Sequence, residues 1–281
     1  MHRLTFHATA RGDSRLWPAG GRQPPGYPGC RHAPLCPRVP EKSHTITRPV
    51  VFVHGVRTSS AIWSHQLDAM RRHGHHAVAV DLPAHGTRAG DRFTWDGAFA
   101  AIDEAVWTCA EPPLLVGLSL GGYISLAYAA RNEGKLAGVL LAGCSTEIRG
   151  KPVGAYRFVA HRLRRVLSDG GGSWDIVTDV LGAMKGYSSL TDLRRINVPV
   201  WLVNGRRDPL RLNERRLAGI RPGTRLNVVP RAGHDVNSHA PAAFNRIVLG
   251  ALRELGLPTG RLAHLPAPRL AVGPLPSPVG S

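Results

Sequence analysis

Short apolar runs rich in β-branched residues alternate with segments of helical periodicity between about residues 46 and 257. Apolar runs that no polar residue interrupts are typical of strands buried on both faces of a parallel sheet. The pattern predicts strands at 49–53, 77–81, 114–118, 136–142, 198–203 and 225–229, with helices over 61–73 and 95–109, from 120, and over 240–255. This alternation predicts an α/β fold with a mostly parallel central sheet and helices on both faces.

The chain divides into one domain and two tails. Residues 1–45 are rich in Pro, Gly, Arg and His without periodicity, and residues 258–281 are rich in Pro. Such segments cannot bury enough apolar surface to fold, so we expect two disordered tails around a domain at 46–257.

A long interval separates the strand that ends near Ala142 from the strand that begins near Val198. It contains amphipathic segments at 153–167 and 176–185, whereas connections in such domains are usually only a few residues long. Ligands of parallel sheets bind beyond the carboxyl ends of the strands, where this interval begins. We therefore expect a small helical lid over about 145–196, with helices packed on the side of the sheet as the alternative.

The apolar run 114–118 ends at Ser119, which lies between Gly117 and Gly121 and precedes a helical segment. Gly-x-Ser-x-Gly between a strand and a helix is typical of a tight, strained turn that presents a nucleophilic serine. The glycines suit a backbone that leaves no room for side chains. The alternative is an ordinary Gly-rich turn in which Ser119 caps the helix.

Two further side chains follow later strands in the order that a serine nucleophile of this kind requires. Asp208 follows the strand at 198–203, and His234 follows the strand at 225–229. A serine hydroxyl needs a base to take its proton, and the base needs a third group to orient it. The backbone N–H groups of Leu120 and Val56 are the candidate donors of an oxyanion hole.

Other polar residues at strand ends are weaker candidates. Glu147 is the first carboxylate after the strand at 136–142, and Asp81 precedes the serine and suits a turn at 84–86. His54 and His85 belong to turn motifs and are expected to be structural. Asp235 is adjacent to His234 and would point elsewhere.

Five sequence blocks in order resemble the α/β-hydrolase fold superfamily, especially its small esterase and hydroxynitrile-lyase branch. They are His54-Gly55 with Trp63 downstream, Asp81-Leu82-Pro83-Ala84-His85-Gly86, Gly117-Leu118-Ser119-Leu120-Gly121-Gly122, Gly205-Arg206-Arg207-Asp208, and Gly233-His234. The resemblance implies Ser119 as the nucleophile, His234 as base and then acid, and Asp208 as its orienting acid. Most members have antiparallel strands before the His-Gly strand, whereas here only residues 43–47 could supply one.

Composition and charge indicate which classes of partner the protein could bind. The formal charge is +17, and 32 of the 36 basic residues are Arg, dispersed without a nucleic-acid-binding motif. We therefore expect no nucleic-acid partner. No apolar run approaches the roughly 20 residues of a membrane span. The four cysteines, at 30, 36, 109 and 144, have no framework spacing, which favours a reduced, cytoplasmic protein without a metal or other cofactor.

The leading hypothesis is a serine hydrolase that cleaves a small-molecule carboxylic ester with a small or medium apolar acyl group through an acyl-enzyme. The same three residues could serve a cofactor-free perhydrolase or haloperoxidase, a thioesterase, a C–C hydrolase or a lyase, because the pocket separates these activities. A ligand receptor without turnover is the alternative from another class. The sequence predicts no oligomeric state.

Overall fold

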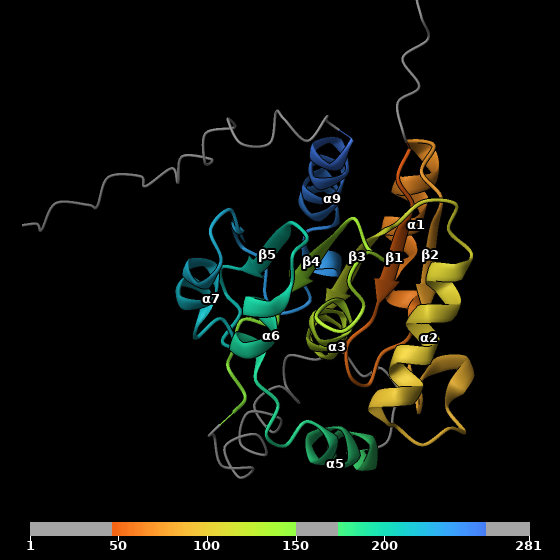
Figure 1. The fold of residues 1–281 in the computed structure, drawn as a ribbon, viewed down its shortest axis with the longest axis vertical. Helices are drawn as coiled ribbons and strands as arrows, with labels where there is room; N and C mark the ends of the chain where they lie inside the picture. The colour runs from red at the N-terminus through yellow and green to blue at the C-terminus, as the bar shows by residue number, and fades with distance from the viewer. Residues whose placement is uncertain (1–46, 150–173, 257–281) are drawn as a thin grey trace, which may run out of the picture. The chain divides into compact units, whose positions relative to one another are not determined.

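The computed structural model of this chain describes residues 47–149 and 174–256. Its centre is one sheet of six parallel strands in the order β2-β1-β3-β4-β5-β6 (Figure 1). The strands are β1 (Val50–Val53), β2 (Ala77–Val80), β3 (Leu114–Leu118), β4 (Gly138–Ala142), β5 (Val200–Gly205) and β6 (Arg225–Val229). The predicted α/β class, with its parallel sheet and six strands, is confirmed.

Successive side chains along β1, β3, β4 and β5 point to opposite faces of the sheet and belong to two separate apolar cores. In β1, Val51 and Val53 belong to one apolar cluster, and Val50 and Phe52 belong to the other. The same alternation holds along β3, β4 and β5. Both faces of these strands are therefore covered, which explains why their sequences are apolar without interruption.

Helices cover both faces of the sheet. On the first face lie α2 (Trp95–Trp107), α3 (Leu120–Ala129), α6 (Ser189–Arg195) and α7 (Glu214–Ile220), and on the second face lie α1 (Ser64–Arg72) and α9 (Pro241–Leu255). The short helix α8 (Val236–His239) leads into α9. Each βα connection carries the chain to the next parallel strand, the connectivity that an alternating pattern predicts.

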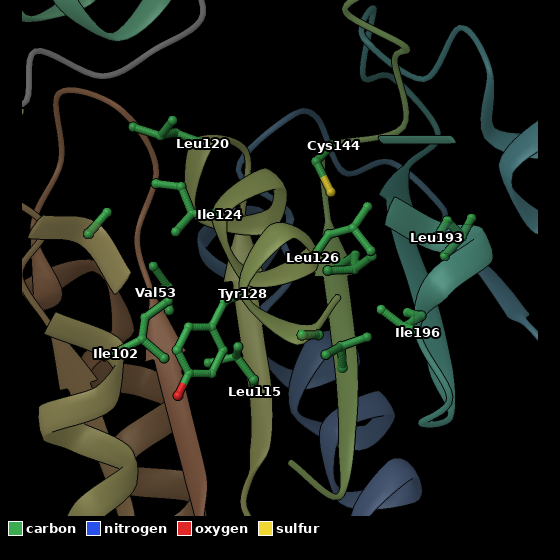
Figure 2. Packing of buried hydrophobic residues seen from close by; sticks show 14 of the residues in the cluster. Val53, Ile102, Leu115, Leu120, Ile124, Leu126, Tyr128, Cys144, Leu193 and Ile196 are labelled. Carbon is green, nitrogen blue, oxygen red and sulfur yellow. The ribbon is translucent and has the colours of Figure 1, made fainter. Parts of the chain in front are cut away.

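Helix α3 is buried along its length and lies directly on the sheet (Figure 2). Ile124 and Tyr128 point toward β1 and α2, while Leu126 points toward β4. The first turn lies so near β1 that a Cβ atom added at Gly121 would be 2.3 Å from the carbonyl oxygen of Val53. Only glycine at this position allows the helix to begin where it does.

The second face is built around aromatic contacts between α9 and the sheet. Phe244 is fully buried, and its ring centroid lies 5.9 Å from that of Trp63, which in turn lies 4.9 Å from that of Phe52. Trp63 ends a short 3₁₀ helix, Ser60–Trp63, that precedes α1. This stack joins α9 to β1, an interior strand of the sheet.

Several boundaries differ from the prediction. The helix predicted over 61–73 is a 3₁₀ turn followed by α1, and the strand predicted over 136–142 begins at Gly138. Helices α6, α7 and α8 were not predicted. They have 7, 7 and 4 residues, too few for a periodic pattern to stand out, and packing against the domain stabilises them.

Only part of the predicted lid falls within the described residues. Helix α5 (Trp174–Ala183) lies beyond the carboxyl ends of the strands, below α3 in Figure 1. Helix α6 packs instead on the side of the domain, against α3 and α7. The amphipathic segment predicted at 153–167, both predicted tails, and the possible strand at 43–47, except for Thr47, lie outside the described residues.

The core of the second face gives a stability prediction. Phe244→Ala removes a fully buried ring beside Trp63 and is expected to lower the free energy of unfolding by about 3–5 kcal/mol. Thermal denaturation followed by circular dichroism should show a melting temperature lower by roughly 10 °C. Arg246→Ala, at an exposed position of the same helix, is the matched control and should change stability by less than about 0.5 kcal/mol. Equal melting temperatures for both variants would contradict this account of the core.

Candidate active site

The backbone at Ser119 has a rare conformation. Ser119 joins β3 to α3 with φ 54° and ψ −116°, in a region that non-glycine residues seldom occupy. A Cβ atom added at Gly117 would be 2.3 Å from the carbonyl oxygen of Gly121, so the chain doubles back without room for side chains. The glycines on both sides of Ser119 therefore have the physical role that the sequence pattern predicts.

Ser119 occupies the N-cap position of α3, but its hydroxyl caps no backbone N–H group. Its backbone carbonyl accepts from Gly122 and Tyr123, and its own N–H donates to Ala142 at 2.7 Å. The backbone thus fixes the turn and leaves the hydroxyl for another partner. The helix-cap alternative does not describe this serine.

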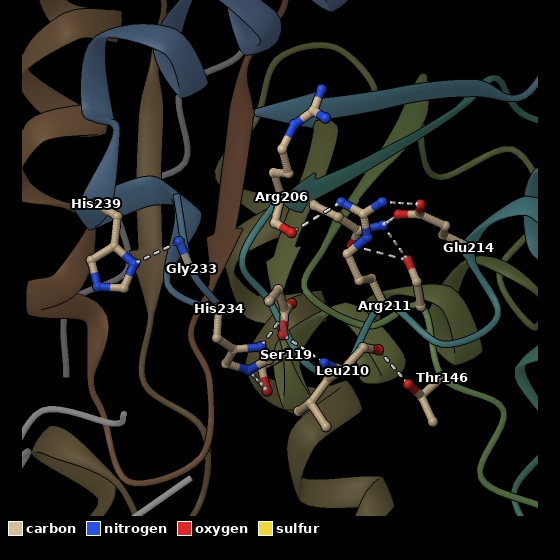
Figure 3. A network of polar contacts seen from close by, with 12 residues as sticks. Ser119, Thr146, Arg206, Leu210, Arg211, Glu214, Gly233, His234 and His239 are labelled. Atoms are coloured by element: carbon tan, nitrogen blue, oxygen red, sulfur yellow. Dashed lines mark hydrogen bonds and ion pairs between the residues drawn. The ribbon is translucent and has the colours of Figure 1, made fainter. Parts of the chain in front are cut away.

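That partner is His234, in the loop after β6. Its Nε2 atom lies 2.9 Å from the Ser119 hydroxyl, and its Nδ1 atom lies 3.0 Å from Oδ2 of Asp208, in the loop after β5 (Figure 3). A carboxylate only accepts, so Nδ1 carries the proton and Nε2 accepts from the serine. The three residues predicted from their order in the sequence form one chain of hydrogen bonds.

Close backbone contacts bring the three loops together. A Cβ atom added at Gly205 would be 2.1 Å from the carbonyl oxygen of Gly233, so the loops that carry Asp208 and His234 touch through glycine. Gly143, after β4, has φ 59°, and a Cβ atom there would be 3.2 Å from the His234 ring. Gly143 thus leaves space for the imidazole.

The surroundings of His234 favour its protonated form. Burial alone would lower the pKa of the imidazole, but the hydrogen bond and negative charge of Asp208 outweigh burial and raise the pKa above its ordinary value of 6.5. The neighbouring Asp235 adds a smaller contribution in the same direction. A base with this environment is suited to accept and hold a proton from a hydroxyl.

The loop after β1 passes directly over the serine. A Cβ atom added at Gly55 would be 3.4 Å from Cβ of Ser119. The next backbone amide, that of Val56, and the amide of Leu120 donate no hydrogen bond to any atom of residues 47–149 or 174–256. Both amides therefore remain candidates for the oxyanion-hole role predicted for them.

Two buried histidines hold this loop in place. His54 donates from Nδ1 to the carbonyl of Gly55 at 2.7 Å and accepts at Nε2 from the amide of Leu82 at 3.0 Å. Burial lowers its pKa to about 4, so the ring is neutral. His85 donates to the carbonyl of Pro83 at 2.9 Å and accepts from the amide of Arg57 at 3.1 Å. These bonds account for the structural roles expected of both histidines.

The other carboxylates at strand ends serve the scaffold. Asp81 accepts from the amides of Ser60 and Thr87 and so fixes the turn that follows β2. Glu147 accepts from the Ser189 hydroxyl and the Leu190 amide at the start of α6. Asp208 is the only carboxylate within hydrogen-bond distance of His234 in the described part of the chain.

No group of three or more His, Cys, Asp or Glu side chains that could hold a metal ion occurs among the described residues. Cys109 and Cys144 carry free thiols, and Cys30 and Cys36 lie outside the described residues. No helix in that part of the chain is long and apolar enough to cross a membrane.

Sequence reasoning missed three residues that are linked by hydrogen bonds to Asp208, within or beside the loop after β5 that carries it (the acid loop). The Thr146 hydroxyl donates to the Leu210 carbonyl, the Leu210 amide donates to Asp208 Oδ1 at 2.8 Å, and the Tyr123 hydroxyl donates to the Thr146 carbonyl at 2.8 Å. These residues belong to none of the five motif blocks. Leu210 lies two residues after Asp208, a spacing typical of an Asx turn, whereas no spacing in the sequence relates Thr146 or Tyr123 to Asp208.

Two curated proteins are similar to this chain in sequence. The pimeloyl-[acyl-carrier protein] methyl ester esterase of Neisseria meningitidis is 31% identical over 235 residues, which covers 67% of this chain and 72% of the relative. The AB hydrolase superfamily protein YisY of Bacillus subtilis is 29% identical over 90 residues, 31% of this chain and only 34% of that protein.

A solved bromoperoxidase from Bacillus anthracis superposes with a TM-score of 0.63 at 18% identity, covering 75% of this chain and 93% of that one. At this identity the likeness establishes the fold alone. The family model described as the alpha/beta hydrolase family matches residues 50–247, well over half of the chain. With the parallel sheet, the strained turn and the sequence relatives in agreement, this chain belongs to the alpha/beta hydrolase family of enzymes.

Proposed function

We propose that this enzyme is a serine hydrolase that cleaves a carboxylic ester with a small or medium apolar acyl group through an acyl-enzyme. The observation that carries the proposal is the position of His234 between two partners, 2.9 Å from the Ser119 hydroxyl and 3.0 Å from Asp208. A serine with a base and an orienting acid at these distances is equipped for acyl transfer.

In the first half-reaction, Ser119 Oγ attacks the ester carbonyl carbon while His234 Nε2 takes the hydroxyl proton. The tetrahedral intermediate then breaks its bond to the alcohol oxygen, which leaves with the proton from His234. A water molecule repeats the sequence on the acyl-enzyme, giving the carboxylic acid and regenerating the serine. Asp208 keeps the proton of Nδ1 in place and stabilises the imidazolium form in both halves.

The amides of Val56 and Leu120 are the proposed donors to the oxyanion. A donor aimed at the developing negative charge is worth about 10²–10³ in turnover. Rigid support for Val56 is consistent with this role, since His54 and His85 bind the backbone on either side of it.

Ester chemistry is supported by the relative at 31% identity, whose name describes a methyl ester esterase. An apolar acyl group suits the aromatic side chains that adjoin the nucleophile helix. Tyr123 lies one helical turn after Ser119, its ring packs edge-on against Tyr187, and Tyr187 packs against Trp95. These rings offer apolar surface beside the proposed nucleophile.

A reducing, cytoplasmic location is part of the proposal, because the described thiols of Cys109 and Cys144 are unpaired. A small-molecule ester is the proposed substrate, without a nucleic-acid partner, metal or organic cofactor.

The nucleophile is tested by a fluorophosphonate reagent, which phosphonylates an activated serine. The wild-type protein is expected to carry the adduct on Ser119 and to hydrolyse p-nitrophenyl acyl esters, whereas Ser119→Ala should lose about 10⁴-fold or more in kcat. Ser125→Ala, on the same helix, removes a buried hydroxyl that has no hydrogen-bond partner among the described residues, and it should retain activity.

Peptide mapping by mass spectrometry locates the adduct. Equal inactivity of wild type and Ser119→Ala toward short and long acyl esters, together with no labelling, would refute the proposal. A parallel panel of acyl-CoA, cyanohydrin and peroxide with acetate tests the thioesterase, lyase and perhydrolase alternatives on the same triad.

The pH dependence follows from the raised pKa of His234. The base must be neutral to accept the serine proton, so kcat/KM should rise with pH along a limb whose apparent pKa lies above 6.5. Asp208→Asn removes the carboxylate that raises this pKa, so the limb should move to lower pH while kcat falls about 10⁴-fold.

Asp235→Asn is the matched control for the acid. Asp235 affects His234 through charge without a hydrogen bond, so this variant should keep kcat within a few-fold of wild type. The apparent pKa of the rising limb of kcat/KM should be slightly lower than in the wild type. Equal losses for the two variants would contradict a specific role of Asp208.

A further inference from the structure

Hydrogen bonds join the nucleophile helix to the loop that carries Asp208 by a route separate from the triad. Tyr123 extends from α3, and its hydroxyl donates to the carbonyl of Thr146 at 2.8 Å. The Thr146 amide donates back to the same hydroxyl at 3.3 Å. Two bonds thus tie the segment after β4 to a residue four positions after Ser119.

The route continues from Thr146 into the acid loop. The Thr146 hydroxyl donates to the carbonyl of Leu210, and Figure 3 shows these residues facing each other beside the Ser119–His234 pair. The amide of Leu210 donates to Asp208 Oδ1 at 2.8 Å, while Oδ2 of the same carboxylate binds His234. Both carboxylate oxygens are therefore held, one by the loop and one by the base.

The ring closes at the nucleophile. His234 binds the Ser119 hydroxyl, and the backbone carbonyl of Ser119 accepts from the amide of Tyr123 at 3.2 Å. One continuous ring of hydrogen bonds thus runs through Ser119, His234, Asp208, Leu210, Thr146 and Tyr123. It sets the acid loop relative to the helix that presents the serine.

We propose that Thr146 and Tyr123 are positioning residues that hold the Leu210 peptide so that Asp208 faces His234. The inference rests on the proposed function, since it assigns these residues a part in the same triad. Thr146 acts through Leu210, and Tyr123 acts through Thr146. Neither contacts His234 directly through a hydrogen bond in the described part of the chain.

Other bonds keep the loop folded when this support is removed. The amide of Asn213 donates to the Ser145 carbonyl at 2.9 Å, and the amide of Arg207 donates to the Ala232 carbonyl at 2.9 Å. These bonds hold the two ends of the segment that contains Asp208 and Leu210. Loss of the Thr146 hydroxyl should therefore turn the Leu210 peptide and loosen the carboxylate without unfolding the loop.

The charged groups around His234 define what a pH profile would report. Asp208 faces its Nδ1 atom from the loop after β5, and Asp235 follows it in the chain. His239 on α8 interacts electrostatically with Asp235, and the Cys144 thiol after β4 lies near Asp208. The substitutions below leave all four groups in place, so a shift of the profile reports the Asp208–His234 contact.

Thr146→Val removes the hydroxyl and preserves the shape of the side chain. In steady-state hydrolysis of p-nitrophenyl acyl esters, we expect kcat to fall about tenfold to hundredfold with KM unchanged, because small displacements of a catalytic group are this costly, and the rate of fluorophosphonate labelling should fall with it. The apparent pKa of the limb along which kcat/KM rises with pH should also move down toward 6.5, since a looser Asp208 supports the imidazolium less well. Thr146→Ser, which keeps the donor, should restore both values.

Thr108→Val is the matched control, because the Thr108 hydroxyl also donates to a backbone carbonyl, that of Ala105 at 2.7 Å, at the end of α2. Its kinetics should equal those of wild type. Tyr123→Phe provides a second variant if Thr146→Val fails to fold. It should lower kcat by a smaller factor and lower the apparent pKa of the rising limb by a smaller amount. Tyr128→Phe, on the same helix with its hydroxyl bound to Asp103, is its control.

The assay is the rate of fluorophosphonate labelling as a function of pH, joined to proton NMR of the strongly deshielded Nδ1 proton of His234. The inference would be overturned if both Thr146→Val and Tyr123→Phe had the labelling rate of the wild type and an unshifted His234 Nδ1 proton. Labelling of Ser119 in the same experiment would still support the proposed function. Absence of labelling in the wild type would refute the function. The NMR signal would then still test the positioning: a shift in Thr146→Val reversed in Thr146→Ser supports it, and no shift overturns it.

Discussion

The site depends on one constraint, the near contact of backbone with backbone where β3 turns into α3. Gly117 and Gly121 allow separations that any side chain would forbid, and Ser119 takes a φ of 54° between them. A residue in such a region costs about 1–3 kcal/mol, which the buried packing of α3 on the sheet offsets. The strain lifts the hydroxyl from the cap position and directs it toward His234.

The same constraint fixes the neighbouring loops. Because Gly121 lies against the carbonyl of Val53, the start of α3 and the end of β1 form one unit, and the loop at Gly55 follows directly over Ser119. The loop after β1 and the turn after β3 therefore meet at the serine, because these two strands are neighbours in the sheet. His54, at the start of this loop, accepts from the Leu82 amide after β2, and His85, in the turn after β2, accepts from the Arg57 amide of the loop. Geometry at the serine is thus supported by the centre of the sheet rather than by a flexible surface segment.

The sequence was sufficient where local patterning decides the structure. Unbroken apolar runs predicted the six parallel strands, and the order of Ser119, Asp208 and His234 predicted three residues that the structure joins by hydrogen bonds. The lid prediction was less informative, because the sequence between β4 and β5 did not reveal α6. The seven residues of this helix are stabilised by packing against α3 and α7 and are too few to show a periodic pattern. Thr146 and Tyr123 could not be found either, because their relation to Asp208 passes through the backbone of Leu210. Contacts of that kind leave no residue-type signature.

The segment after β4 illustrates how the position of the acid shapes the rest of the site. Gly143 yields space to the imidazole, and the first carboxylate beyond it, Glu147, binds the start of α6 instead of His234. The carboxylate that binds His234 instead comes from the loop after the neighbouring strand β5, and other residues must hold this loop in place. Thr146 holds the loop by donating to the Leu210 carbonyl, and Tyr123 connects Thr146 to α3, the helix that begins after Ser119. With Asp208 in the loop after β5, the segment after β4 thus contributes to the support of that loop through Thr146 and Ser145.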